Sequence, residues 1–549
     1  LCRDSNNLTM VGDDAQSIYS FRGANIKNIL NLKKAYPALK IFKLEQNYRS
    51  TRNIVNAANS LIAKNSEQIK KEVFSENEVG AKIEVLNSST DFEEAYLVAN
   101  RISQLQRSSH DNLDEFAILY RTNAQSRRLE ESLRKRNISY RIYGGLSFYQ
   151  RKEIKDAISY FRLATNPDDD EALRRIINYP ARGIGETTVN KIVRAAIDNS
   201  VSMWSVICSP DTYNLEVNSG TLKKLNGFRD LISDFVKTNQ SGGDAYLLAT
   251  TIITRTKLLS SLFSDSTPES ISKQENLQEI HSNVKDFVDE HNEIGETNST
   301  DMSHFLAEVS LATDQDEKDT AEHKVTLMTV HAAKGLEFNN VIIVGAEEDL
   351  FPSAMSSSSL NEIEEERRLM YVAITRARKF CMITYASSRF RNGQTKLCQP
   401  SRFLHDIDPK YIKLIQGTDL GYVYQGINPY DSYRESFHSP VMTSVINPAP
   451  SAPPPPGHAS DRWRERAASV NPEKGINNAS QPMPSAGQYS VHSADEVREG
   501  MMIVHERFGK GKILNVHTDP AGEKITVLFA NVAQRTLMLK YARFAIYAQ

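Results

Sequence analysis

Apolar residues near the start of the chain alternate between strand-like runs and helix-like spacing. After Ser50, apolar residues recur every three or four positions, which predicts a helix that Ser50 can cap. The same patterns predict strands at 8–12, 82–86 and 116–120, and helices between 25 and 37 and at 91–105. Strands that alternate with helices favour a mostly parallel sheet.

The pattern changes between 149 and 322, where Leu, Ile, Arg and Asp recur at helical spacing. Strand-like runs return at 325–330 and 341–344, and a charged helix is predicted at 361–379. The simplest account is one α/β domain that is interrupted by a helical domain.

The C-terminal part of the chain contains two segments that differ in composition and hydrophobic pattern. Residues 409–494 are rich in Pro, Ser, Ala and Asn, which predicts a disordered linker. Short alternating runs at 502–505, 512–516 and 524–529 are separated by glycines and predict a small β-barrel.

Composition narrows the class of protein. The 549 residues are 40% hydrophobic and 24% charged, which is typical of soluble globular proteins and enough for three or four domains. The formal net charge is −2, so any surface that binds nucleic acid has to be local. Residues 121–155 carry ten Lys and Arg against three Glu, and they form either a phosphate track or an ordinary solvated face.

The four cysteines predict reduced thiols of a cytoplasmic protein, because Cys2, Cys208, Cys381 and Cys398 lack metal-ligand spacing such as C-x-x-C. No apolar run approaches the roughly 20 residues that span a bilayer, so we expect no membrane partner. The chain opens on Leu1 rather than Met, which suggests a piece of something longer.

The segment 12–24 combines two kinds of chemistry. Acidic residues and Gln16 follow the predicted strand, where an α/β sheet presents its ligand crevice, and a Gln there can sense a terminal phosphate. Tyr19, Phe21 and Arg22 interleave aromatic and basic side chains, as binding of single-stranded nucleic acid requires. A polar turn followed by core aromatics is an alternative of about equal weight.

Three further segments carry candidate phosphate chemistry. Tyr48 and Arg49 offer a stacking face and a guanidinium at a helix start, although a plain N-cap explains this pair better when it stands alone. Residues 329–338 resemble a phosphate-binding Lys-Gly loop. Residues 364–378 form either a solvated helix with i,i+4 charge pairs or a helix in which one of Arg376 and Arg378, which follow an apolar stretch, acts as an arginine finger.

Two motifs of nucleotide hydrolysis are absent from the sequence. No G-x-x-x-x-G-K-[ST] loop is present, since neither Gly-Lys pair in the run 509–512 has a glycine five positions earlier. The closest match to an acidic pair after an apolar strand is Asp13-Asp14, and no such loop is available to pair with it.

In order and spacing, these segments resemble the superfamily-one DNA helicases of the UvrD/PcrA/Rep type. The resemblance covers about 1–405 and again about 495–549. It rests on Gly12-Asp13-x-x-Gln16-Ser17-Ile18-Tyr19-x-Phe21-Arg22-Gly23-Ala24 as motif III, Asn47-Tyr48-Arg49-Ser50 as motif IV, Leu119-Tyr120-Arg121-Thr122-Asn123 as a DNA-contact motif, 331–338 as motif V and 368–377 as motif VI. Residues 180–185 resemble the family's hairpin that touches duplex phosphate.

The resemblance implies an α/β fold in which a RecA-like domain, of the P-loop NTPase class, is interrupted by a helical accessory domain (2B-like) and followed by a Tudor/SH3-like β-barrel. It implies ATP-dependent 3′ to 5′ translocation on single-stranded DNA in repair or replication, with ATP and Mg²⁺ as cofactors and single-strand/duplex junctions as substrates. The implied divisions are a remnant of the first RecA-like domain at 1–44, the second RecA-like domain at 45–148 and 323–408, the accessory domain at 149–322, the linker at 409–494 and the barrel at 495–549.

The residue roles that the resemblance implies fall into three groups. The nucleotide would be sensed, neutralised or held by Gln16, Arg49, Arg376, Tyr48, Gly335 and Glu337. The single-strand path would be lined by Tyr19, Phe21, Arg22, Arg121, Asn123, Thr329 and His331. Duplex phosphate would be contacted by Arg182, Gly183 and Gly185. Phe21 stands where the family often has Trp, which implies weaker stacking.

The family's Walker A loop and magnesium ligands belong to an N-terminal half that this chain is expected to lack, so we expect no metal ligand here and no ATP hydrolysis by the chain alone. The barrel resembles a module that in the family docks to RNA polymerase and repair proteins. Two alternatives stay open. One is a non-motor module that binds DNA or RNA polymerase, and the other is one subunit of a split motor with its P-loop on another chain.

Overall fold

The computed structural model describes residues 9–259, 267–318, 320–391, 394–415, 490–505, 508–519, 522–529 and 533–547. Its centre is an eight-stranded sheet in the order β10-β3-β8-β7-β4-β6-β5, parallel throughout except that β9 pairs antiparallel with β8. The strands are β3 (Ile83–Thr90), β4 (Phe116–Tyr120), β5 (Tyr140–Ile142), β6 (Val325–Thr329), β7 (Phe338–Ile343), β8 (Ala377–Arg391), β9 (Gln394–Leu397) and β10 (Ile412–Ile415). The expected α/β fold with a large parallel sheet is confirmed.

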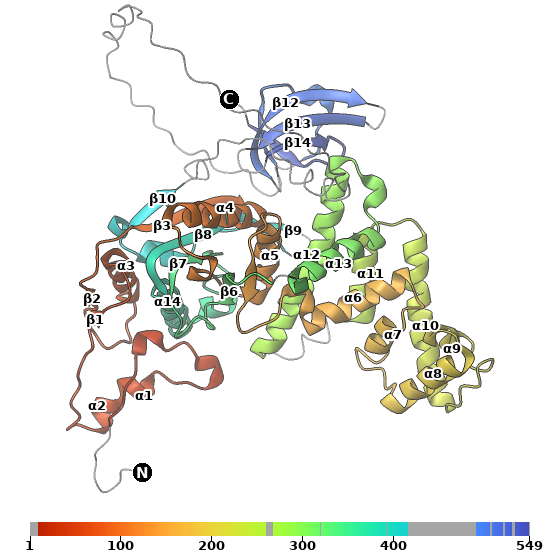
Figure 1. The fold of residues 1–549 in the computed structure, drawn as a ribbon, viewed down its shortest axis with the longest axis horizontal. Coiled ribbons are helices and arrows are strands. Elements are labelled where there is room, and N and C mark those ends of the chain that lie inside the picture. Colours follow the sequence, from red (N-terminus) through yellow and green to blue (C-terminus); the bar gives the residue numbers. More distant parts are fainter. Residues whose placement is uncertain are drawn as a thin grey trace, which may run out of the picture.

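Helices cover both faces of this sheet, as Figure 1 shows. One face packs against α3 (Arg52–Ile62), α14 (Leu360–Ile374) and α15 (Arg402–Asp406). The other packs against α4 (Asp91–Ser109) and α5 (Ser126–Arg134). Strand β4, Phe-Ala-Ile-Leu-Tyr, is buried at every position, because a central parallel strand covered on both faces has no side open to water.

A helical region lies between β5 and β6 and has its own apolar core. Its helices are α6 (Lys152–Thr165), α7 (Asp170–Ile176), α8 (Glu186–Asn199), α9 (Met203–Cys208), α10 (Ser219–Gln240), α11 (Ala245–Thr256), α12 (Pro268–Ile294) and α13 (Met302–Lys318). Figure 1 shows the region projecting to one side of the sheet. It therefore interrupts the sheet in sequence without disturbing the sheet's strand pairing.

The C-terminal residues form a five-stranded antiparallel sheet in the order β14-β13-β12-β11-β15. Its strands are β11 (Met502–His505), β12 (Gly509–Asp519), β13 (Gly522–Phe529), β14 (Ala533–Met538) and β15 (Phe544–Tyr547). This sheet packs on α12 and α4: the Phe508 ring lies 6.2 Å from Phe92, and Arg535 Nη1 lies 3.7 Å from Glu290 Oε1. The antiparallel sheet is confirmed, and its closure into a Tudor-like barrel stays a prediction.

The N-terminal elements are small. They are two 3₁₀ turns, η1 (Asp14–Gln16) and η2 (Ser20–Arg22), the one-turn helices α1 (Lys27–Leu30) and α2 (Leu32–Ala35), and the short parallel pair β1 (Gln46–Asn47) and β2 (Phe74–Ser75). The predicted strand at 8–12 is wrong for its described part, since 9–12 have no strand partner among the described residues and Val11 is 90% exposed. A strand needs a neighbour for its backbone groups.

Three other predictions need correction. The helix expected at 361–379 ends at Ile374, because Ala377 already begins β8, which pairs on both sides with β3 and β7. Thr51, rather than Ser50, is the N-cap of α3, and Ser50 Oγ donates to the Ala377 carbonyl instead, at 2.6 Å.

The predicted linker at 409–494 is wrong at both of its ends, since Ile412–Ile415 form β10 beside β3 in the large sheet and Ser490 forms a β-bridge with Phe544. Most of that segment, 416–489, lies outside the described residues. Within the part of the chain that the structure describes, no helix is long and apolar enough to cross a membrane.

Candidate nucleotide and single-strand site

The segment 12–24 folds against residues that lie more than three hundred positions later in the chain. Tyr19 Oη donates to the backbone carbonyl of His331 at 3.0 Å, and Lys334 Nζ donates to the carbonyl of Gln16 at 2.9 Å. Ile18, between them, is fully buried in the core beneath the sheet. The candidate motifs III and V therefore form one surface.

The same segment also contacts α14, the helix that carries the candidate motif VI. Arg368 Nε donates to the Ser17 carbonyl at 3.1 Å, and Glu365 accepts from the Ser20 amide at 2.9 Å. These contacts hold the backbone of the segment at Ser17 and Ser20, on either side of Tyr19.

Three rings gather on the surface formed by motifs III and V. The ring centroids of Phe21 and His331 lie 5.4 Å apart, nearly edge to face, and Tyr19 lies 5.9 Å from Phe21. The Arg22 guanidinium lies 5.6 Å from the Phe21 ring and 6.0 Å from the Tyr19 ring, and Lys334 Nζ lies 5.3 Å from Tyr19. Phe21 is 47% exposed, so this cluster offers an aromatic face beside positive charge.

His331 is neutral in this cluster. Burial, together with the charges of Arg121 and Arg22, lowers its pKa to about 3. A neutral imidazole between two cations adds a flat ring and no further positive charge.

Several of the residues expected to face a nucleotide form a second group around Glu337, at the loop before β7. Glu337 accepts from Arg49 Nε and from Arg378 Nη2, and these two hydrogen bonds, that of Arg378 first, hold its pKa below the usual range. Arg49 Nη1 also donates to the Thr375 carbonyl at 3.3 Å. Motifs IV, V and VI thus meet at one cluster of arginines.

Arg376 lies in the same cluster, with only 2% of its surface exposed. Its guanidinium donates to the carbonyls of Val372 and Leu336, each at 3.0 Å. Burial, and next the charge of Arg49, lower the pKa of Arg376 to about 10. The group therefore stays protonated at neutral pH and holds a buried positive charge close to Arg49.

Tyr48 and Gly335 lie at the edge of this group. Tyr48 is 78% exposed, with its hydroxyl donating to Gln46 Oε1 at 2.8 Å. Gly335 has φ +93°, a backbone conformation that side-chain-bearing residues rarely adopt. An open ring and a backbone turn free of a side chain give a ligand room beside the arginines.

The remaining residues predicted for the single-strand path make internal contacts. Arg121 holds Glu366 through Nε and Nη2, the latter at 2.7 Å. Asn123 Nδ2 donates to Ser272 Oγ at 3.3 Å. Thr329 Oγ1 accepts from the Ala332 amide at 3.3 Å and so shapes the turn that carries His331.

The predicted duplex contacts lie far from these clusters, in the helical region. Arg182 turns inward: its guanidinium donates to Tyr160 Oη at 2.6 Å and lies 5.4 Å from the Phe228 ring. Gly183 has φ +71°, and Gly185 is the N-cap of α8. The structure does not bring these residues together with the aromatic cluster.

The basic segment 121–155 is mostly an internal interface rather than a phosphate track. Arg127 and Arg128 are buried and both contact Asp286 on α12, at 3.2 and 2.5 Å. Arg151 is also buried and donates to Ser126 Oγ at 2.7 Å. Acidic residues of α12 neutralise Arg127 and Arg128, and these acidic residues lie too far away in sequence for a local count of charges to detect.

Sequence reasoning missed two cations of the site. Lys334 was part of the Lys-Gly loop, yet no role was assigned to it, and it contacts both Gln16 and Tyr19. Lys71 contacts Asp13 and Asp14, and nothing in its local sequence distinguishes it from its neighbour Lys70.

Comparison with known families matches most of the chain to two family models. Residues 42–388 match the UvrD-like helicase C-terminal domain, and residues 1–37 match the UvrD/REP helicase N-terminal domain. This chain belongs to the UvrD-like helicase family. Because 1–37 match the N-terminal domain, part of that domain is present, and the expectation of a chain that lacks the N-terminal half is not supported.

Curated relatives of the family cover nearly the whole chain. The ATP-dependent DNA helicase PcrA of Staphylococcus epidermidis is 36% identical over 544 residues, which are 99% of this chain and 67% of the relative. The protein of the same name from Leuconostoc citreum is 33% identical over 549 residues, 99% of this chain and 68% of the relative. The chain therefore spans about two thirds of the length of these relatives.

Proposed function

We propose that this chain forms the part of an ATP-dependent DNA helicase that binds single-stranded DNA and carries one wall of the ATP site, with movement 3′ to 5′ along the strand. The observation that carries the proposal is the cluster of Tyr19, Phe21 and His331, with Arg22 beside two of the three rings. Bases stack on exposed rings, and cations nearby neutralise phosphates.

The group of residues around Glu337 supports the part of the proposal that concerns ATP. Arg49 and Arg376 bring two guanidiniums close together, with Glu337 as the carboxylate that Arg49 contacts, and a triphosphate would supply further negative charge beside them. Tyr48 is open for stacking on adenine, and Gln16 contacts Lys334, which lies in the loop between His331 and Glu337. Bound ATP would supply the phosphoryl group, while these side chains bind, orient and neutralise it.

The described residues do not fit Mg²⁺. The carboxylates that come closest, Asp13 and Asp14, both contact Lys71 Nζ, and that ammonium group fills the place a cation would take. Among the residues that the structure describes, no group of three His, Cys, Asp or Glu is placed to hold a metal ion.

The sequence also contains no Walker A loop, so we infer that the chain by itself hydrolyses no ATP. Phosphoryl transfer needs the loop that cradles the phosphates as well as the arginines that neutralise them. By itself, the chain would then bind DNA without acting as a motor.

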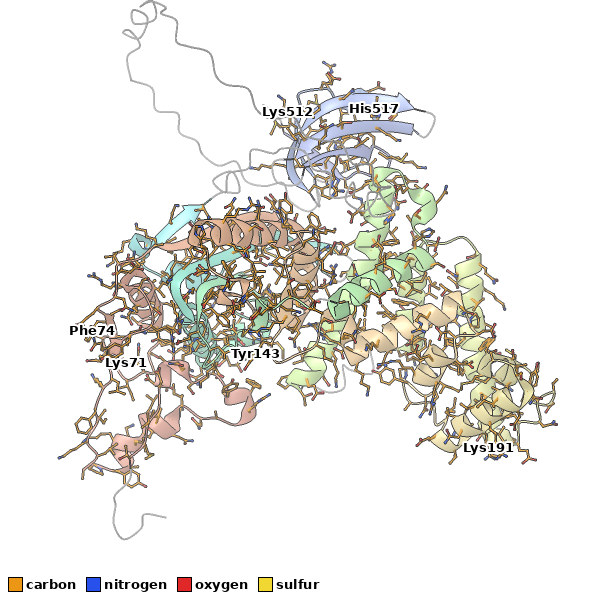
Figure 2. All side chains as sticks on the ribbon, in the orientation of Figure 1. Lys71, Phe74, Tyr143, Lys191, Lys512 and His517 are labelled. Atoms are coloured by element: carbon orange, nitrogen blue, oxygen red, sulfur yellow. The ribbon has the colours of Figure 1, made fainter. Side chains whose placement is uncertain are left out.

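The C-terminal sheet supports a further part of the proposal, docking to RNA polymerase or a repair protein. Lys512 and His517 on β12 are exposed, and Figure 2 shows them on the part of the sheet that faces away from the rest of the molecule. A solvent-facing strand that carries an exposed lysine suits an acidic protein surface.

The substitution Phe21→Ala tests the DNA-binding proposal. Loss of one stacking ring weakens binding of a fluorescent oligo(dT) by about 1–3 kcal/mol, roughly fivefold to more than a hundredfold. Fluorescence anisotropy of the 549-residue chain measures the affinity. Tyr36→Ala removes an exposed aromatic residue outside the cluster and is expected to leave the affinity unchanged. Equal oligo(dT) affinity in wild type and Phe21→Ala would refute the proposal.

A further inference from the structure

Lys71, in the loop between α3 and β2, reaches across to the N-terminal segment. Its Nζ lies 2.5 Å from Asp13 Oδ1 and 3.2 Å from Asp14 Oδ1. Figure 2 shows Lys71 where the N-terminal segment meets the α3 side of the large sheet. The backbone next to it takes part as well, because the Ile69 amide donates to Asp14 Oδ2 at 2.8 Å.

The carboxylate that Lys71 holds also holds Gln16. Gln16 Nε2 donates to Asp13 Oδ2 at 2.5 Å, while the Ala15 amide donates to Asp13 Oδ1 at 3.1 Å and starts the turn η1. One side chain of Asp13 therefore links the ammonium of Lys71 to the amide of Gln16. Lys334 and Arg368 hold the backbone of the same turn, at the Gln16 and Ser17 carbonyls.

Lys71 is the cation that contacts both carboxylates of this group. Asp14 is only 4% exposed, and Asp13 is its neighbour, so two adjacent carboxylates would repel each other in a partly dry site. Burial alone would lower the pKa of Lys71, but the hydrogen bond and charge of Asp13, with Asp14, raise it, so the side chain stays protonated. Removing one partner of such a group leaves charge buried without compensation.

We propose that Lys71 is a positioning residue: through Asp13 it orients Gln16 and ties the turn 13–17 to the large-sheet domain, so that the aromatic residues that follow are held ready for a DNA strand. This rests on the proposed function. Without Lys71 the carboxylates turn toward water, Gln16 loses its acceptor, and the turn that leads to Tyr19 loosens.

The test measures oligo(dT) affinity of the full chain by fluorescence anisotropy for Lys71→Met, Asp13→Asn and the double variant. Lys71→Met keeps the length of the side chain and removes its charge, and we expect about fivefold weaker binding. Lys71→Arg, which restores the charge, is expected to bind nearly as well as the wild type. Lys70→Met is the matched control, because Lys70 is the exposed neighbour with the same charge.

Action through Asp13 predicts that the double variant binds no more weakly than either single variant. Additive losses, or unchanged binding by Lys71→Met while Phe21→Ala binds more weakly, would overturn the proposal. Circular dichroism melts check that each variant is folded, and Lys71→Arg decides the question if Lys71→Met does not fold: the proposal then requires it to bind within twofold of wild type.

Hydrogen exchange separates this proposal from the proposed function. Peptides that cover 13–18 are expected to exchange faster in Lys71→Met than in Lys70→Met or wild type. If Phe21→Ala leaves DNA binding unchanged, the DNA-binding proposal fails, and faster exchange in Lys71→Met still supports the positioning role. Unchanged exchange in Lys71→Met overturns that role whatever the DNA result.

Discussion

Arg389, on β8, is the cation of an enclosed ion network, and its replacement by Met tests how the large sheet is held together. Its Nε and Nη2 donate to the two oxygens of Glu347, at 2.6 and 2.7 Å, and Nη2 also contacts Glu94 on α4. Arg389 is 7% exposed, Glu94 3% and Glu347 1%. The network joins a strand, a helix and the loop after β7.

The expected loss of stability follows from this burial. Arg389→Met keeps most of the side-chain volume and leaves two carboxylates buried without their cation. Breaking a buried pair costs about 3–5 kcal/mol, and two orphaned carboxylates place the cost near the upper end. For a domain of about 150–250 residues, each kcal/mol of lost stability lowers Tm by about 2–4 °C. We therefore expect the Tm of Arg389→Met to be about 10–20 °C below that of the wild type.

The loss should depend on pH. Burial and the charge of Glu347 raise the pKa of Glu94, and Arg389 opposes that rise. Removing Arg389 therefore raises the pKa of Glu94 further. A carboxyl whose pKa is higher in the folded than in the unfolded state destabilises the fold only while it is ionised. The Tm deficit of Arg389→Met then shrinks as the pH falls from 7.5 to 5.

Thermal unfolding at the two pH values, followed by circular dichroism, measures the deficit. The matched control is Arg402→Met, because Arg402 pairs with Glu348 at 2.6 Å but its side chain is 44% exposed. Exposed pairs contribute at most about 1 kcal/mol. Equal deficits for the two variants, or a deficit for Arg389→Met that grows in acid, would refute the reasoning.

Two further predictions concern the site. The folded pKa of His331 is about 3, lowered by burial first, against about 6.5 unfolded, so its stabilising effect is complete above pH 6.5 and is lost as the pH falls toward 3. In urea denaturation, His331→Phe should therefore lose less stability than wild type between pH 7 and 4.5, and parallel losses would contradict this. The purified chain with ATP, Mg²⁺ and oligo(dT) should release no phosphate, because it contains no Walker A loop, and DNA-stimulated release would disprove that inference.

Elements with a strong local pattern could be predicted closely. Strand β4 was expected at 116–120 and occupies Phe116–Tyr120, because a short apolar run can be buried on both faces only as a central strand. Strand β8 was missed, since Ala377–Arg391 carries charges that read as a helix end, and its strand form depends on β3 and β7 beside it. Pairing with distant neighbours leaves no mark in local spacing.

Some features of the candidate site could likewise be predicted from local sequence, and others could not. Tyr19, Phe21 and Arg22 were identified from the sequence, because aromatic and basic residues interleave within four positions. The sequence could not predict that Phe21 contacts His331, that Arg182 turns inward, or that Arg127 pairs with α12. Each of these contacts depends on which distant segments pack together.

The sequence by itself determined the class of fold, the order of the motifs and the types of residue that can stack on a base or neutralise a phosphate, since these depend on periodicity and side-chain chemistry. Only the tertiary structure decided which charges are used up internally. A buried cation that a buried carboxylate neutralises is not available to a ligand, and Arg128 contacts Asp286, which lies 158 positions away in the sequence. Lys71 and Lys70 are identical in sequence terms, and the fold alone places one of them against Asp13.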